Sequence, residues 1–429
     1  MGNILRTALV GLAAIVMLTP TAHADFTEDQ QQCNGAGPDL DGRVAACSRQ
    51  IGSGRWQGHN LAVSYNNRGV AYKDKGDLDR AISDYNQTIQ LDPKYVFAYS
   101  NRGNAYADKK DYDRAIADYG QAIGLDPHYA AAYNGRGNAY VNKKDYDVAI
   151  ADYNQAIELD PNYVFAYNGR GHAYAEKKDY DRAIADYTHA IALDPKYSFA
   201  YNNRAIAYKN KGDLDRAFAD YNQAIQLDPK YVAAYNGRGN AYLDRKSYDR
   251  AIADYAQAIQ LDPKYVDAYN GRGNAYLAEK DYDRAVADYN QAIGLDPDYV
   301  LAYNGRGNAH ANKKDYDRAI ADYTQAIKID PKYVPPYNNR AIAYKSKGDL
   351  DRTIADYSRA IALDPKYVDA YNGRGNAYAD KKDYDRAIED YTQAIQIAPK
   401  FIFPYNNRAI AYRNKGDFDR AITDYTQAI

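Results

Sequence analysis

Apolar residues recur along this chain with a fixed period of 34 residues that begins at Ala62. A representative repeat reads VAAYNGRGNAYLDRKSYDRAIADYAQAIQLDPKY, with apolar or aromatic residues at helical spacing on both sides of a Lys-Ser, Lys-Gly or Lys-Asp break. The pattern predicts two antiparallel helices, helix A over positions 2–14 and helix B over positions 17–30. A strict period of this size is typical of a stacked array in which each repeat contacts its neighbours.

Helix boundaries follow from two recurring polar or rigid positions. Aspartate at position 16, for example Asp77, Asp111 and Asp145, is placed to cap helix B. Proline at position 32 ends helix B because it lacks an N–H and disfavours helix in the preceding residue. Pro335, Pro336 and Pro404 fall in the first turn of helix A, where proline is tolerated.

Eleven repeats fill residues 62–429, and the last is truncated at Ile429 before its proline. Position 8 is Gly or Ala, position 11 Tyr, position 20 Ala, position 24 aromatic, position 27 Ala and position 32 Pro in nearly every repeat. This residue set resembles the tetratricopeptide repeat. The resemblance implies an all-α fold, a right-handed superhelical α-solenoid of about eleven helix-turn-helix units. It also implies a concave face made by the A helices that binds proteins or peptides.

Position 7 departs from that family, where leucine is usual, because it is arginine in all eleven repeats. Position 23 is aspartate equally often, so we predict structural ion pairs between helices A and B, of which Arg238 and Asp254 are the example. Removing one partner of such a buried pair would strand the other charge. The alternative is an arginine ladder that binds an acidic partner.

Two further positions of helix A carry asparagine, and in the family such positions line the concave groove. An amide both donates and accepts, so it can pair with a passing peptide backbone without reading side chains. The arrangement resembles the asparagine-lined superhelix of the enzyme that transfers N-acetylglucosamine to Ser and Thr, without a catalytic domain. The predicted groove residues are Asn66, Asn134, Asn168, Asn202, Asn236, Asn270, Asn304, Asn338, Asn372 and Asn406 at position 5, and Asn104, Asn138, Asn240, Asn274, Asn308 and Asn376 at position 9. Ser100 is the exception at position 5.

Glycine at position 6 of six repeats, such as Gly135 and Gly169, weakens helix A. Either a ligand approaches the backbone closely there, or the packed helices leave no room for a side chain. Repeats 5, 9 and 11 instead place Ile206, Ile342 and Ile410 at position 9, which would give apolar anchor points along an extended partner.

The first 24 residues read as a secretory signal peptide, with an apolar run from Thr7 to Leu18 and a small-residue site ending at Ala24. That run is too short for a retained membrane anchor, because a spanning helix needs about 20 residues. We therefore expect a bacterial periplasmic or secreted protein. Residues 25–61 then form an N-terminal capping segment in which Cys33 and Cys47 would pair as a disulfide after export. Two unrelated thiols are the alternative.

The net charge and the lack of catalytic or metal-binding motifs bear on which function classes we expect. The formal net charge is −2 and both signs recur in every repeat, so nucleic acid is not expected as a partner. The histidines share no metal-ligand spacing, and no nucleophile-base set stands out from the repeats. We expect no enzyme activity, no metal and no cofactor. The truncated final repeat would expose apolar surface and permit self-association through the C-terminal end.

The sequence thus predicts a non-enzymatic scaffold that binds an extended peptide or protein in an asparagine-lined groove. A cell-envelope protein that binds carbohydrate is the alternative, since amides and tyrosine hydroxyls also suit sugars. That alternative requires several of the 48 tyrosines to point into the groove.

Overall fold

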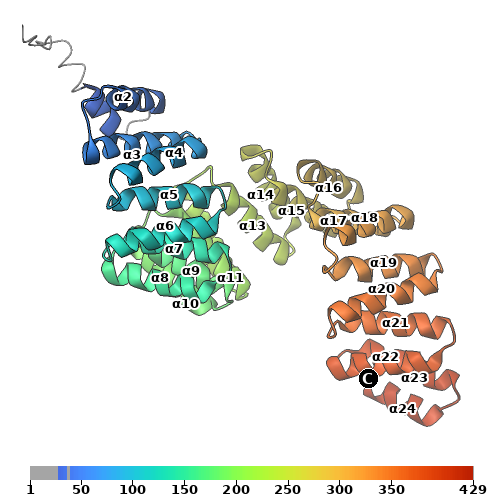
Figure 1. Cartoon of the computed structure of the whole chain (residues 1–429). Helices are drawn as coiled ribbons and strands as arrows, with labels where there is room; N and C mark the ends of the chain where they lie inside the picture. Colours follow the sequence, from blue (N-terminus) through green and yellow to red (C-terminus); the bar gives the residue numbers. More distant parts are fainter. Residues whose placement is uncertain (1–27, 36–38, 429) are drawn as a thin grey trace, which may run out of the picture. The chain divides into compact units, whose positions relative to one another are not determined.

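The computed structural model describes residues 28–35 and 39–428, and helices are the only regular secondary structure in them. A helical segment over residues 28–34 and helix α2 (Leu40–Gly52) precede the array of helix pairs, which Figure 1 shows as stacked hairpins. The all-α prediction is confirmed. The predicted signal peptide over residues 1–24 lies outside the described residues.

Helix bounds follow the repeat. The A helices are α3 (Gly58–Asp74), α5 (Val96–Asp108), α7 (Ala130–Asn142), α9 (Val164–Glu176), α11 (Ser198–Asn210), α13 (Val232–Asp244), α15 (Val266–Ala278), α17 (Val300–Asn312), α19 (Pro335–Ser346), α21 (Val368–Asp380) and α23 (Ile402–Asn414). The B helices are α4 (Leu78–Leu91), α6 (Tyr112–Leu125), α8 (Tyr146–Leu159), α10 (Tyr180–Leu193), α12 (Leu214–Leu227), α14 (Tyr248–Leu261), α16 (Tyr282–Leu295), α18 (Tyr316–Ile329), α20 (Leu350–Leu363), α22 (Tyr384–Ile397) and α24 (Phe418–Gln427). Most A helices begin at position 1 and end at position 13, one residue earlier than predicted.

The prolines and the capping aspartates lie at the helix ends where they were predicted, and one aspartate, Asp145, does not cap its helix. Pro335 occupies the first turn of α19, as predicted. Asp77 accepts a hydrogen bond from the backbone N–H of Arg80 at 3.2 Å and so caps α4. Asp145 precedes α8, but its side chain accepts no backbone bond, so the prediction that it caps this helix is wrong. The residue three positions later is Val148 there, whereas the capped helices place an arginine at that position.

The turn between helices A and B needs a left-handed residue at position 15. Glycine supplies it in four repeats, for example Gly212 with φ 85°. Lysine adopts the same conformation in the other seven, for example Lys246 with φ 59°. Because a Cβ atom is strained in this region, the lysine repeats carry a local conformational cost.

The described chain divides into two compact segments, one that ends at Ala207 and one that begins at Tyr208. Within each, an A helix packs against its own B helix and the B helix packs against the next A helix. The buried residues are mainly alanines around one tyrosine at position 24. Tyr153, for example, lies with Ala149, Ala156, Ala166 and Ala173 in one cluster. Alanine permits close helix approach, and the tyrosine fills the space that remains.

The N-terminal segment packs on the first repeat. Cys33 and Cys47 are joined by a disulfide in the structure. Helix α2 contacts α3, and the Ser64 hydroxyl donates a 2.9 Å hydrogen bond to the Gln50 side chain. This helix therefore covers the first A helix as a preceding B helix would.

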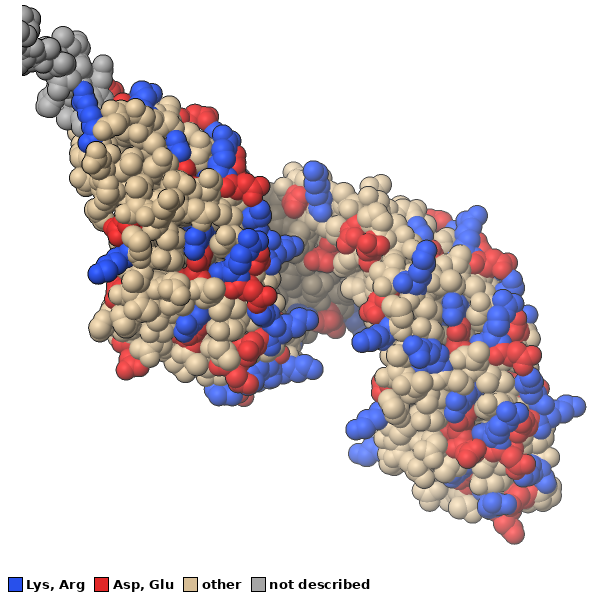
Figure 2. All heavy atoms as spheres, viewed as in Figure 1, with Lys and Arg blue, Asp and Glu red and all other residues tan. Residues whose placement is uncertain are grey.

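Two surface properties bear on partners. No helix among residues 28–35 and 39–428 combines the length and apolar character needed to cross a membrane. Figure 2 shows Lys and Arg interspersed with Asp and Glu over the visible face, so no single sign of charge dominates there.

Candidate functional site

The invariant arginines are structural. In Arg238, Nε and Nη2 donate to the two carboxylate oxygens of Asp254 at 2.8 and 2.7 Å, and the aspartate is buried. This hydrogen bonding raises the pKa of Arg238 above its usual value. Nine further repeats show the same bidentate pair: Arg68–Asp84, Arg102–Asp118, Arg136–Asp152, Arg170–Asp186, Arg272–Asp288, Arg306–Asp322, Arg340–Asp356, Arg374–Asp390 and Arg408–Asp424.

The third nitrogen of most of these arginines binds the preceding repeat, a contact that the sequence analysis missed. Nη1 of Arg238 donates to Asn222 at position 25 of that repeat, at 2.6 Å. Arg204 does the same with Thr188, at 3.0 Å. Arg136 and Arg272 have no such acceptor among the described residues of the preceding repeat, because their counterparts at position 25 are Gly120 and Ala256. Because these guanidinium groups are engaged within the array, the alternative of an arginine ladder for an acidic partner loses its support.

Five of the ten position-5 asparagines are buried between helices. Asn66, Asn134, Asn202, Asn270 and Asn338 are each 9 % exposed or less. In four junctions the side-chain oxygen accepts from an asparagine at position 6 of the next repeat, as Asn66 does from Asn101 at 3.0 Å. Asn66, Asn202, Asn270 and Asn338 are therefore too buried to present their carboxamides on an open groove, which disagrees with the prediction for these four. Asn134 is also buried but lines a cleft, so its predicted place in the groove stays a prediction.

Packing also explains the position-6 glycines. A Cβ atom on Gly135 would lie 2.6 Å from Cε1 of Tyr119, and one on Gly169 would lie 2.6 Å from Cε1 of Tyr153. In both cases the ring belongs to position 24 of the preceding repeat. Of the two interpretations left open, lack of room is the one the structure supports, because the tyrosine already fills the space.

The position-9 asparagines, unlike those at position 5, are hydrogen-bonded to a tyrosine of their own repeat. Each accepts a hydrogen bond through its side-chain oxygen from the hydroxyl of the position-24 tyrosine in its own repeat, and burial raises the pKa of these tyrosines, which keeps them protonated as donors. The oxygen is thereby engaged, and the amide nitrogen is left as the group that faces away from the tyrosine. The bonded pairs are Tyr119–Asn104 (2.7 Å), Tyr153–Asn138 (2.6 Å), Tyr255–Asn240 (2.7 Å), Tyr289–Asn274 (2.7 Å), Tyr323–Asn308 (2.8 Å) and Tyr391–Asn376 (2.8 Å).

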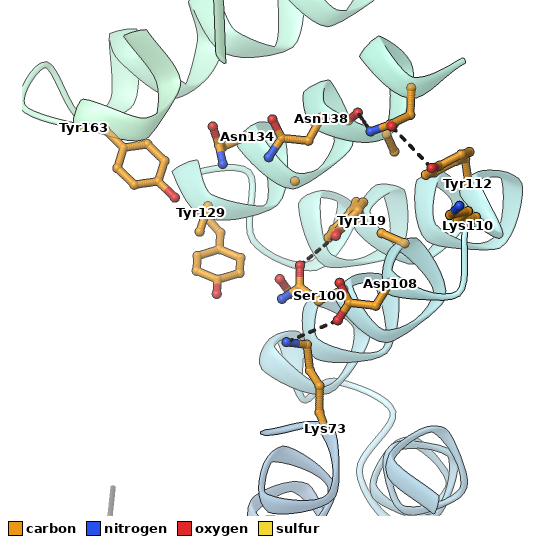
Figure 3. Close-up of a pocket in the computed structure, with 16 residues that line it drawn as sticks. Lys73, Ser100, Asp108, Lys110, Tyr112, Tyr119, Tyr129, Asn134, Asn138 and Tyr163 are labelled. Carbon is orange, nitrogen blue, oxygen red and sulfur yellow. Dashed lines mark hydrogen bonds and ion pairs between the residues drawn. The ribbon is translucent and has the colours of Figure 1, made fainter. Parts of the chain in front are cut away.

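A cleft of about 530 Å³ lies over repeats 2 and 3, within the size range of ligand sites. Figure 3 shows the carboxamides of Asn134 and Asn138 with their nitrogen atoms turned toward it, and the rings of Tyr129 and Tyr163 on one side. On the opposite side, Lys73 forms an ion pair with Asp108 at 3.3 Å. The two tyrosines are at position 34, in the turn between repeats, where helical periodicity gave no signal.

Small residues line this cleft. Ser100 stands at position 5, where other repeats have asparagine, and Gly135 stands at position 6. Ala131 stands at position 2, where the flanking repeats have Phe97 and Phe165. In the sequence, Ser100 stands out only as the exception at position 5, and no periodic signal connects it with Ala131 and Gly135.

An exposed aromatic ridge borders the same part of the first compact segment. Phe97 lies edge-on to Tyr95 and to Tyr129, with ring centroids 5.9 and 5.5 Å apart. Phe165 makes the same contacts with Tyr163 and Tyr197, at 5.9 and 5.7 Å. Both phenylalanines are more than half exposed. The ridge thus presents apolar ring surface next to the amide donors of the cleft.

Two smaller clefts lie in the second segment. One of about 410 Å³ is lined by Asn308 and Ile342, and one of about 170 Å³ by Asn376 and Ile410. Ile206, Ile342 and Ile410 are all exposed, which is the arrangement that apolar anchor points require. Each of these two clefts joins an asparagine of one repeat to an isoleucine of the next.

His310 is buried at position 11 in place of a tyrosine, so it packs in the seam between helices. Residues 28–35 and 39–428 contain no group of three or more His, Cys, Asp or Glu side chains placed to hold a metal ion.

Four models of repeat families match the chain. The model described as TPR repeat matches residues 69–110, 207–245, 239–279 and 343–382. Three models described as tetratricopeptide repeat match residues 100–164 and 270–334, residues 164–197 and 368–401, and residues 186–219, 322–355 and 390–423. Together the matches run without a gap from residue 69 to residue 423.

Solved structures show similarity at low sequence identity. Yeast Tom70 is 18 % identical, with 86 % of this chain and 91 % of that chain covered and a TM-score of 0.44. A chain of the APC/C hetero-tetramer Cut9–Hcn1 is 15 % identical, with 95 % of this chain and 91 % of that chain covered and a TM-score of 0.47. A tetratricopeptide repeat protein from Parabacteroides merdae is 19 % identical, with 58 % of this chain and 98 % of that chain covered and a TM-score of 0.47. No curated protein matches the chain.

Proposed function

The chain belongs to the tetratricopeptide repeat family, and from this premise we propose that it is a non-enzymatic scaffold that binds an extended peptide or protein segment. The position-9 asparagines carry the proposal. Their oxygens accept from buried tyrosine hydroxyls, so their nitrogens are held as donors in successive repeats. Repeated donors suit the carbonyl groups of an extended backbone, which recur along any sequence.

A display experiment tests this function. A library of random dodecapeptides is selected on the full chain and on a variant that combines Asn240→Asp, Asn274→Asp and Asn308→Asp. Aspartate keeps an oxygen for the tyrosine hydroxyl and replaces the amide donor with a negatively charged acceptor, which repels a peptide carbonyl. We expect peptides enriched on the natural chain to lose most of their binding to the variant. Equal retention on both proteins would contradict the assigned surface.

Carbohydrate binding is the second candidate, and one observation favours it. Tyr129 and Tyr163 line the cleft beside Asn134 and Asn138, which places rings and amides together as sugar sites require. A glycan array probed with the full chain separates this candidate from peptide binding. Sugar binding that competes with no selected peptide would favour it.

Location and self-association complete the proposal. The sequence of residues 1–24 supports export to the periplasm or the medium, which mass spectrometry of the mature N-terminus would test.

The apolar side chains of Phe418 and Ile422 on α24 are both exposed. We therefore propose a second copy of the chain as a partner for that surface. Sedimentation velocity should show association that Ile422→Lys abolishes, and a monomer at high concentration would contradict it.

A further inference from the structure

We propose that the cleft over repeats 2 and 3 binds a proline-rich segment in the polyproline II conformation. This inference rests on the proposed peptide-binding function and names the chemistry of the peptide. Three features of the cleft support it: the type of hydrogen-bonding group that it offers, the spacing of those groups, and the aromatic surface beside them.

Each position-9 amide in this cleft has an N–H donor, whereas its side-chain oxygen already accepts from a tyrosine hydroxyl. The oxygen of Asn104 accepts from Tyr119 at 2.7 Å, and the oxygen of Asn138 accepts from Tyr153 at 2.6 Å. The buried oxygen of Asn134 faces away from solvent, while its nitrogen turns toward the cleft. An ordinary extended peptide brings a backbone N–H for every carbonyl, and these N–H groups would compete with the tyrosine hydroxyls for the asparagine oxygens. Proline has a carbonyl and no N–H, so a proline-rich segment matches these donors.

The spacing of the donors fits the same conformation. Asn104 and Asn138 occupy the same position on neighbouring A helices, α5 and α7, which contact each other. Packed helices lie about 8–10 Å apart. Polyproline II has three residues per turn and a rise of about 3.1 Å per residue, so its equivalent carbonyls recur about every 9 Å. One turn of that helix therefore spans one repeat and returns a carbonyl to the same side.

Aromatic surface completes the match. Tyr129 and Tyr163 line the cleft, and Phe97 and Phe165 extend the ring surface on either side of Ala131. Proline-rich segments dock in aromatic-lined grooves, where flat pyrrolidine rings pack between aromatic side chains. The small side chain of Ala131 leaves the gap between the two phenylalanines open.

Peptide binding to the full chain tests the conformation. A fluorescent dodecapeptide with nine prolines and three glutamines is compared, by anisotropy, with the same peptide carrying alanine in place of each proline. We expect the proline peptide to bind at least tenfold more tightly, because it is pre-ordered and brings few unpaired N–H groups. Equal affinities, or no binding of the proline peptide at millimolar concentration, would overturn the inference.

Variants test the location. Asn104→Asp with Asn138→Asp removes two donors and keeps both oxygens for the tyrosines, so we expect at least tenfold weaker binding with an unchanged circular dichroism spectrum. Asn154→Asp is the matched control, because Asn154 lies on α8 outside the cleft and its side-chain oxygen, which the change keeps, accepts from Nη1 of Arg170 at 2.7 Å, so affinity should be unchanged. Ala131→Phe, which copies the neighbouring repeats, should close the cleft and abolish binding. Unchanged affinity in both cleft variants would overturn the assigned site.

The display experiment separates this inference from the proposed function. Enriched peptides that depend on the position-9 amides but lack proline would leave the scaffold function standing and defeat the polyproline II inference. Enrichment of proline-rich peptides that the double aspartate variant releases would support both.

Discussion

The ring of Tyr153 lies between two glycines of successive A helices, Gly137 of its own repeat and Gly169 of the next. A Cβ atom on Gly169 would come within 2.6 Å of the ring, and one on Gly137 within 2.9 Å. The ring occupies the centre of its repeat and is almost completely buried. Its hydroxyl also holds Asn138 at the cleft, so one tyrosine joins core packing to the candidate site.

Gly169→Ala should therefore destabilise the array, although alanine is the better helix former. Overpacking a rigid aromatic ring costs about 1–3 kcal/mol, which exceeds the gain of about 1 kcal/mol in helix propensity. Urea unfolding followed by circular dichroism measures the change. Gly120→Ala is the control, because an added Cβ there meets no atom within 4 Å and should stabilise α6. A stabilised Gly169→Ala variant would contradict the packing account.

Breaking one ion pair should be costly. Asp254→Ala leaves the half-buried guanidinium of Arg238 without its carboxylate, and we expect a loss of about 3 kcal/mol. The double variant Arg238→Met with Asp254→Leu should recover much of that loss, because no charge is then stranded. Hydrogen exchange localised to α13 and α14 is the measurement. A loss below about 1 kcal/mol would mean that water readily solvates the stranded arginine.

Adding a missing bond between repeats should stabilise the array. Nη1 of Arg238 donates to Asn222, which stands at position 25 of the preceding repeat. The residue at position 25 before Arg272 is Ala256, which has no side-chain acceptor. Ala256→Asn should create the same hydrogen bond to Arg272 and raise the free energy of unfolding by about 1 kcal/mol. The reverse change, Asn222→Ala, should lower it by a similar amount. Thermal unfolding of the two variants beside the natural chain gives both values, and shifts of the same sign would contradict the prediction.

Replacing a left-handed lysine with glycine should also stabilise the chain. Lys246 has φ 59°, whereas four other repeats use glycine at this position. Lys246→Gly removes strain of about 1 kcal/mol and keeps the turn. The matched change Gly348→Lys should cost a comparable amount. Urea midpoints test the pair, and a destabilised Lys246→Gly variant would show that the lysine side chain makes compensating contacts.

His310 should make stability depend on pH. Burial lowers the pKa of His310 below its usual value of 6.5, and the charges facing it are Asp322, Asp315, Arg306 and Arg318. The folded state therefore disfavours protonation, so the stabilising effect is present above the unfolded pKa and declines as pH falls through 6.5 toward the lower folded pKa. His310→Tyr, the residue of the other repeats, should reduce the loss of stability between pH 8 and pH 5. An identical pH dependence in the variant would contradict the assignment.

The sequence by itself determined the repeat, the helix type and most helix boundaries. Local chemistry sufficed for these features: the period of apolar residues, proline after helix B and aspartate before it, as at Asp77, act over a few residues. The Arg238–Asp254 pair was also visible, because both residues recur without exception at fixed positions. These features can be predicted from the spacing of residue types along the sequence, without knowing how the helices pack.

The tertiary structure alone decided which asparagines face a partner. Positions 5 and 9 are four residues apart on one helix, so periodicity places both on the same side. Neighbouring A helices enclose Asn202, whereas a tyrosine hydroxyl holds Asn138 at the edge of a cleft. The cleft itself depends on Ser100, Ala131 and Gly135 meeting across repeats. Those outcomes follow from how closely successive helices pack, which is a property of the stacked array and not of any single repeat.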